Sequence, residues 1–101
     1  MRVVQLEETF YFTFPSRAFA TGVPAALAGT PDLSAIELDS SLGVIDTGIT
    51  VAAHGTITAL NVGTVIATAA NGYESGKVYD VVIDTGTAGG TSVVGEKVYE
   101  F

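Results

Sequence analysis

The sequence has no cysteine, no tryptophan and only one histidine, His54, in 101 residues. Without cysteine it has no disulfide framework, no thiol nucleophile and no cysteine-based zinc site. A single histidine cannot form a histidine metal cluster. The length fits one small domain, which we expect to span residues 1–101. The composition therefore leaves many familiar catalytic and metal chemistries without their residues.

Basic residues are also scarce, with 4 lysines and arginines against 11 acidic residues and a net charge of −7. Proteins that bind nucleic acid neutralise phosphates with a basic surface, which this chain cannot build. Anionic lipid headgroups are disfavoured for the same reason. We therefore expect that the partners are neither nucleic acid nor membrane.

Residues 47–73 carry no full charge, and a run of that length could cross a bilayer as a helix. The run is crowded with threonine and glycine and contains His54 and Asn61, so it is better explained by β-strands. Glu7 and Glu8 interrupt the apolar start of the chain, and no secretory signal is visible. We expect a protein made in a cytoplasm and used there or assembled there into something larger.

Helical periodicity is almost absent, whereas β-branched and aromatic runs recur between glycine, proline, asparagine and aspartate. The sequence predicts an all-β fold, an immunoglobulin-like antiparallel β-sandwich of about seven short strands. Gly63 indicates a bulge or a break inside one strand. The expected strands are 9–14, 33–38, 48–53, 56–68, 77–84 and 92–101, with turns at 39–42 and 69–76 and a flexible hairpin connection at 85–90.

Alternation identifies the candidate core. Phe10, Phe12 and Phe14 share one face of the first strand, and Tyr79, Val81 and Ile83 share one face of a later strand. We predict that these side chains are buried. Tyr79 also stands near the start of the penultimate strand, where immunoglobulin-like domains often carry a tyrosine corner. An ordinary half-buried strand tyrosine is the alternative explanation.

The triplet Asp-Thr-Gly occurs twice, at 46–48 and 84–86, and it is the active-site triplet of aspartic proteases. That chemistry needs two carboxylates that share a proton. The copies are too close in sequence for two protease lobes, and neither is followed by the downstream hydrophobic-hydrophobic-glycine element. His54 has no G-x-S-x-G partner motif for a serine hydrolase. We expect a protein that is not an enzyme and has no catalytic residues.

The acidic residues offer hard oxygen ligands, so calcium is a better candidate metal than zinc. No EF-hand or RTX spacing is present, and scattered surface acids explain the pattern better. We expect neither a metal site nor a cofactor. The acids considered are Asp32, Glu37, Asp39 and Asp46.

Three phrases resemble a group of small β-rich proteins encoded among the virion genes of tailed bacteriophages. The last phrase is similar to the "TAGTVxGxSVVGE" pattern that precedes the final strand in that group. The phrases are TGVPAALAGTP at 21–31, ATAANGYESGKVYDVVI at 67–83 and GTAGGTSVVGE at 86–96.

The resemblance implies a structural role on the virion, assembled in the host cytoplasm, and no catalytic residues. It implies a head decoration or cement protein that binds the major capsid protein, or alternatively the N-terminal anchor domain of a head or tail fibre. Because this sequence ends at Phe101 where many relatives continue into a fibre, we expect the self-contained form. Other virion proteins and further copies of the chain are also candidate partners.

Two further readings remain open. Residues 1–8 are a candidate N-terminal arm that adds a strand to a neighbour through Val3, Val4 and Leu6, although an ordinary first strand of the same sheet explains them equally well. A carbohydrate-binding immunoglobulin-like module is the alternative from another class. Its stacking residues would be phenylalanines or the tyrosines, Tyr11, Tyr73, Tyr79 and Tyr99.

Overall fold

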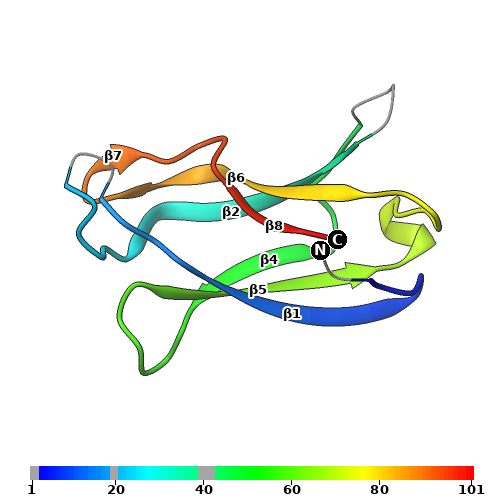
Figure 1. The fold of residues 1–101 in the computed structure, drawn as a ribbon, viewed down its shortest axis with the longest axis horizontal. Helices are drawn as coiled ribbons and strands as arrows, with labels where there is room; N and C mark the ends of the chain where they lie inside the picture. Colours follow the sequence, from blue (N-terminus) through cyan, green and yellow to red (C-terminus); the bar gives the residue numbers. More distant parts are fainter. Residues whose placement is uncertain (1–2, 19–20, 39–42) are drawn as a thin grey trace.

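The chain folds as two antiparallel β-sheets packed face to face, as seen in a computed structural model that describes residues 3–18, 21–38 and 43–101 (Figure 1). The prediction of an all-β sandwich is confirmed. One sheet has the order β1-β5-β4, and the other has the order β3-β2-β6-β7, with β8 also paired to β6. The strands are β1 (Glu8–Pro15), β2 (Leu27–Glu37), β3 (Val44–Ile45), β4 (Ile49–Ala53), β5 (Leu60–Ala67), β6 (Tyr79–Ala88), β7 (Thr91–Ser92) and β8 (Lys97–Glu100), and one short 3₁₀ turn, η1, covers Ala69–Asn71.

The core lies between the sheets and is built from alternating strand residues. In β1 the even-numbered phenylalanines point inward, while the odd-numbered residues are exposed. The Phe12 ring stacks on Tyr99 of β8 with centroids 4.4 Å apart and planes 7° apart. Phe10 meets Phe101 edge-on at 4.9 Å. The predicted core residues Phe10, Phe12, Phe14, Tyr79, Val81 and Ile83 are all buried.

Gly63 does not mark a bulge, and that expectation was wrong. It pairs with Phe12 in an unbroken register between β1 and β5. A Cβ atom at this position would lie 2.3 Å from Cζ of Phe12 and 2.6 Å from its Cε1. The glycine is needed because the Phe12 ring lies directly over the backbone of the neighbouring strand.

Several strand boundaries differ from the expectation. Strand β2 begins at Leu27, six residues earlier than expected, because its first part pairs with β6 despite register shifts on either side of Asp32. Gly29 and Thr30 adopt positive φ angles of 73° and 54° within that irregular part. Because such residues are typical of turns, the sequence predicted a connection here. Pairing with β6 makes the segment part of a strand.

Other differences concern the middle and end of the chain. Strand β5 begins only at Leu60, after a turn, and β6 continues to Ala88, so the expected connection at 85–90 shrinks to a turn at Gly89-Gly90. With the two-residue strands β3 and β7, the described residues contain eight strands, against about seven expected. The turn expected at 39–42 lies outside the described residues.

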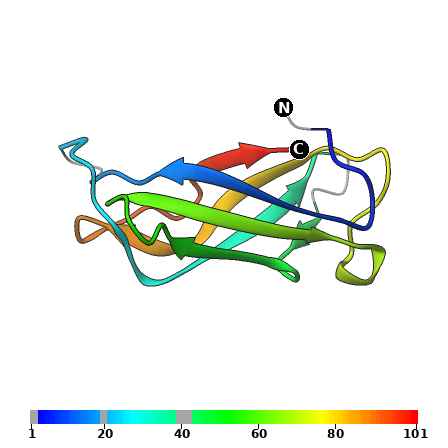
Figure 2. The ribbon, with the colours of Figure 1, turned by 90° about the horizontal axis from the view of Figure 1, so that it is seen from below.

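The uncharged run 47–73 contains β4 and β5, as the sequence predicted. Figure 2 shows these strands running beside β1 in one layer. Within the described ranges no helix is long and apolar enough to cross a membrane.

We expect Gly63→Ala to lower the free energy of unfolding by about 1–3 kcal/mol, because the added methyl group overlaps the Phe12 ring and forces the two strands apart. Urea denaturation followed by circular dichroism measures the change. Gly55→Ala is the matched control, since nothing lies within 4 Å of a Cβ built at Gly55. Equal destabilisation by both substitutions would contradict the packing role of Gly63.

Candidate functional site

Tyr79 anchors the corner that connects β5 to β6. Its hydroxyl oxygen accepts a hydrogen bond from the backbone N–H of Glu74 at 2.8 Å, five residues back along the chain. The ring is only 2% exposed and meets Tyr73 edge-on at 5.3 Å. Burial raises the pKa of Tyr79 above its usual value, and the bond from Glu74 partly opposes that rise. The hydroxyl therefore stays protonated and serves to hold the corner in place.

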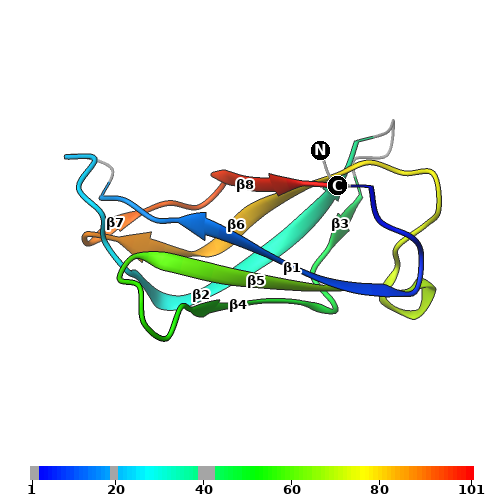
Figure 3. The same ribbon diagram turned by 60° about the horizontal axis from the view of Figure 1, so that its bottom comes forward.

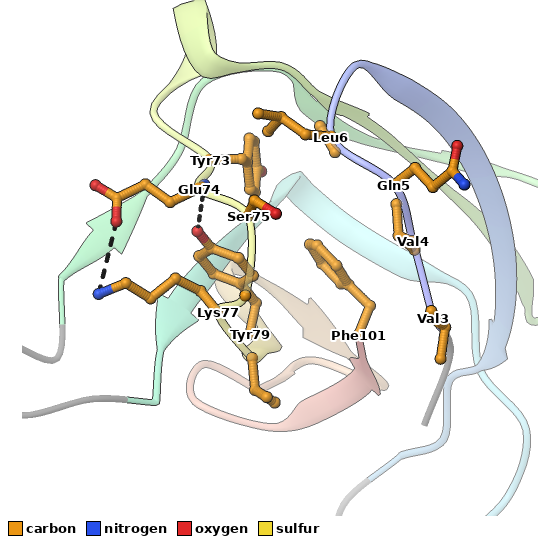
Figure 4. Close-up of a pocket in the computed structure, with 13 residues that line it drawn as sticks. Val3, Val4, Gln5, Leu6, Tyr73, Glu74, Ser75, Lys77, Tyr79 and Phe101 are labelled. Atoms are coloured by element: carbon orange, nitrogen blue, oxygen red, sulfur yellow. Dashed lines mark hydrogen bonds and ion pairs between the residues drawn. The ribbon is translucent and has the colours of Figure 1, made fainter.

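A cavity of about 290 Å³ opens beside this corner, at one end of the sandwich (Figure 4). Phe101, Val4 and Leu6 form apolar walls around it. The ion pair between Lys77 and Glu74, with nitrogen and oxygen 3.6 Å apart, lies at its rim. The cavity can receive a small apolar group.

Tyr73 lines the same cavity and is 2% exposed. Its hydroxyl has no hydrogen-bond partner among the described residues. Burial, with a smaller contribution from Tyr79, raises the pKa of Tyr73 to about 12. A phenol with this pKa remains neutral near pH 7 and cannot act as a general base there.

The candidate N-terminal arm does not form a strand in residues 3–7. Val4 packs against the core, whereas Val3 is 90% exposed. The segment is fixed to its own domain, because the Glu7 N–H donates to the Ala67 carbonyl at 2.8 Å and the Glu7 carboxylate accepts from the Ala69 N–H at 3.2 Å. These bonds hold the segment over the end of the sandwich.

The two Asp-Thr-Gly triplets are not brought together. Asp46 follows β3 and Asp84 lies in β6, and β2 runs between these strands. Because β2 lies between them, β3 and β6 are two strand spacings apart, about 10 Å. That distance is too large for the two carboxylates to share a proton. Both residues are exposed, Asp46 just after the end of β3 and Asp84 in the middle of β6. The geometry provides no aspartic-protease dyad.

His54 is a turn residue. Its Nδ1 atom accepts hydrogen bonds from the backbone N–H groups of Thr56 at 3.1 Å and Ile57 at 3.0 Å. Nδ1 therefore stabilises the turn between β4 and β5. In a hydrolase triad the same nitrogen would instead bond to a carboxylate, which orients the imidazole ring.

The acidic residues considered for calcium do not converge in the part of the chain that the structure describes. No group of three or more potential metal ligands occurs among those residues. Asp39 lies outside them.

Aromatic side chains give little surface for stacking on sugars. Tyr73 and Tyr79 are buried, and Tyr99 is half-buried against Phe12. Among the described aromatic residues only Tyr11, at 63% exposure, presents much of its ring to solvent.

Among the residues that the structure describes, none with a charged side chain lies on the outer face of the β1-β5-β4 sheet, although the protein has a net charge of −7. We call it the neutral face. Tyr11 and Ile66 are its most exposed large apolar groups. Its side chains are Thr9, Tyr11, Thr13 and Pro15 of β1, Leu60, Val62, Thr64 and Ile66 of β5, and Thr50 and Ala52 of β4.

The outer side of the other sheet is different. Lys97 of β8 forms ion pairs with Asp80 of β6 at 3.0 Å and with Glu100 of β8 at 2.8 Å. Asp84 adds a further negative charge on β6. Sequence reasoning missed the neutral face because it appears only when the three strands are placed in register. The available signal was the absence of charge at alternate positions of 9–15 and 60–66.

Comparison of the chain with protein-family models, with curated proteins and with solved structures gave no match.

We expect Tyr79→Phe to lower the free energy of unfolding by about 1 kcal/mol, because it removes the hydrogen bond that the Glu74 N–H makes. Tyr73→Phe is the matched comparison, since the Tyr73 hydroxyl is buried with no hydrogen-bond partner among the described residues, and its loss should be neutral or slightly stabilising. Thermal and urea unfolding of both variants measure the difference. A cost for Tyr73→Phe as large as that for Tyr79→Phe would count against this assignment.

Stability should also fall between pH 10 and 12. The unfolded chain releases the Tyr73 proton near its ordinary pKa of 10.0, whereas the folded chain keeps it to about 12. The unfolded state therefore binds fewer protons in that interval, and rising pH favours it. Urea midpoints measured from pH 8 to 12 should decline less for Tyr73→Phe than for the wild type. Tyr11→Phe, at an exposed site, should retain the wild-type decline.

Proposed function

We propose that the chain is a non-enzymatic structural protein of a tailed-phage virion, a head decoration protein that binds the shell surface through its neutral face. The resemblance of its three sequence phrases to small virion proteins supports the virion role. The neutral face is the structural observation that carries the binding mode. The virion, assembled in the host cytoplasm, is the location that goes with this role.

We further infer that the sandwich is immunoglobulin-like. The order β1-β5-β4 corresponds to strands B-E-D of that fold, and β3-β2-β6-β8 corresponds to C′-C-F-G. Tyr79 then stands at the start of strand F, and its bond to the Glu74 N–H has the backward direction of a tyrosine corner. Domains of this architecture serve many functions, so the fold alone does not specify what this chain binds. The proposed binding mode depends on the neutral face.

The neutral face suits docking onto a protein surface. Acidic groups elsewhere on the chain keep the free protein soluble and apart from acidic neighbours. A face without charges loses no ion hydration when it is covered, and its threonines can hydrogen-bond at the rim of a contact. Covering the neutral face therefore costs less desolvation free energy than covering the outer face of the other sheet.

The size of the face sets the strength of the contact. With strands about 4.8 Å apart and a rise of about 3.3 Å per residue, three strands present roughly 400 Å². A standard interface buries about 800 Å² on each partner. One copy alone therefore makes a modest contact with a shell.

Co-sedimentation of the purified protein with undecorated phage capsids tests the proposal. We expect saturable binding at a copy number set by the symmetry of the shell. Thr50→Glu and Ile66→Glu should each weaken binding about tenfold or more, because each places an unpaired charge in the covered face.

Val44→Glu is the matched control, since Val44 is an exposed residue in a strand of the other sheet. It should bind as tightly as the wild type. An absence of binding to capsids, or equal losses from Val44→Glu and Thr50→Glu, would overturn the proposed mode.

A further inference from the structure

The cavity beside the Tyr79 corner is enclosed by three segments that are distant in the sequence. Residues 3–6 form one wall, the loop that leads into β6 forms another, and Phe101 contributes the third side. Figure 3 shows the N-terminal segment, the end of β8 and that loop close to one another. The cavity is therefore a product of the tertiary fold.

Three aromatic rings line the cavity and contact one another. The Tyr79 ring meets Tyr73 edge-on with centroids 5.3 Å apart and stacks on Phe101 at 5.2 Å. The Tyr73 and Phe101 centroids lie 6.0 Å apart. Aromatic rings attract further rings through edge-to-face and offset-stacked contacts. A ligand that carries an aromatic ring would therefore join an existing cluster of three.

Volume and charge limit the ligand to a small neutral molecule. The cavity measures about 290 Å³, whereas sites for drug-sized ligands measure roughly 300–1,000 Å³. The charged side chains in its described lining, Glu74 and Lys77, are paired with each other. A charged ligand would lose hydration without meeting an unpaired charge among these side chains.

The Tyr73 hydroxyl offers a polar group to such a ligand. It is buried with no hydrogen-bond partner among the described residues, an arrangement that is unfavourable for a hydroxyl. Because the pKa of Tyr73 is raised to about 12, the hydroxyl keeps its proton at neutral pH and can donate a hydrogen bond. An acceptor oxygen on the ligand would satisfy it.

The wall formed by residues 3–6 can move aside to admit the ring. Within the described ranges, the backbone of segment 3–7 is held by the bond from the Glu8 N–H to the Gln5 carbonyl at 3.1 Å and by the bond from the Glu7 N–H to the Ala67 carbonyl at 2.8 Å. Val4 and Leu6 are therefore held mainly by side-chain packing. A segment with so few hydrogen bonds opens at low free-energy cost, which gives the ligand a path to the Tyr73 hydroxyl.

We propose that this cavity binds a small neutral aromatic molecule, whose ring packs against Tyr73, Tyr79 and Phe101 and whose acceptor oxygen bonds to the Tyr73 hydroxyl. The compound p-cresol has this size and chemistry, with one ring, one methyl group and one hydroxyl group. The cavity shares no lining residue with the neutral face, so this is a second binding activity.

NMR titration of the isotope-labelled protein with p-cresol tests the site. We expect saturable shifts of the backbone N–H signals of the lining residues, with a dissociation constant on the order of 1 mM or lower. The saturated analogue, methylcyclohexanol, should bind about threefold or more weakly because it lacks the aromatic ring. Shifts that do not saturate, or that lie away from the cavity, would overturn the site. Equal binding of the saturated analogue would overturn the aromatic class.

Toluene and Tyr73→Phe together test the hydrogen bond. Toluene has the ring and methyl group of p-cresol but no hydroxyl. The preference of the protein for p-cresol over toluene, as a ratio of dissociation constants, should fall about threefold or more in Tyr73→Phe, since the variant cannot donate the bond. An unchanged ratio would overturn the role of the Tyr73 hydroxyl.

A larger side chain at Val4 tests the location. Val4→Phe fills space in the cavity and should raise the dissociation constant of p-cresol about tenfold or more. Val23→Phe is the matched control, because Val23 is exposed and does not line the cavity, and it should leave the constant within about threefold.

If Val4→Phe fails to fold, Leu6→Trp blocks the same space from a partly exposed position, with Val23→Trp as its control. Equal effects of a cavity variant and its control would overturn the assignment to this cavity. These measurements use free protein without capsids, so their failure is distinct from a failure to bind shells.

Discussion

The contact between Phe12, Gly63 and Tyr99 sets how the two sheets meet. Phe12 lies over the bare backbone of Gly63 in its own sheet and stacks on Tyr99 of the facing sheet at 4.4 Å. Phe10 and Phe14 extend the same row of rings along β1. Because protein interiors are close-packed, this row leaves little freedom for either sheet to slide. The neutral face on the outside of β1, β5 and β4 depends on that fixed interior.

Charge is divided unequally between the two outer faces. Asp80, Lys97 and Glu100 form a network on one sheet, whereas alternate residues of the other sheet are threonine or apolar. This division follows from the two-residue period of strands, because a single residue of slip would exchange inner and outer side chains. The register of β1 on β5 therefore fixes both the phenylalanine core and the neutral face.

Much of the fold could be predicted from local pattern. The alternation of phenylalanine in β1 and of Tyr79, Val81 and Ile83 in β6 predicted strands and buried faces, and both predictions agree with the structure. The first part of β2 could not be found this way, because Gly29 and Thr30 resemble a turn and only pairing with β6 makes them part of a strand. Gly63 was misread because its partner, the Phe12 ring, lies about fifty residues away in the sequence.

The candidate site was harder to predict than the fold. Tyr79 could be singled out because its bond reaches only five residues back to Glu74. The neutral face combines three strands, so no single segment reveals it.

The position of the chain ends has a consequence for engineering. Val3 and Phe101 line the same cavity, so the two ends of the described chain lie close together, beside the end of β8 (Figure 1). A tag or reporter attached to either end would leave from beside β8, which belongs to the other sheet than the one that carries the neutral face. The same arrangement allows the original ends to be joined by a short linker and new ends to be opened in the turn at Gly55, because termini that lie close together tolerate circular permutation.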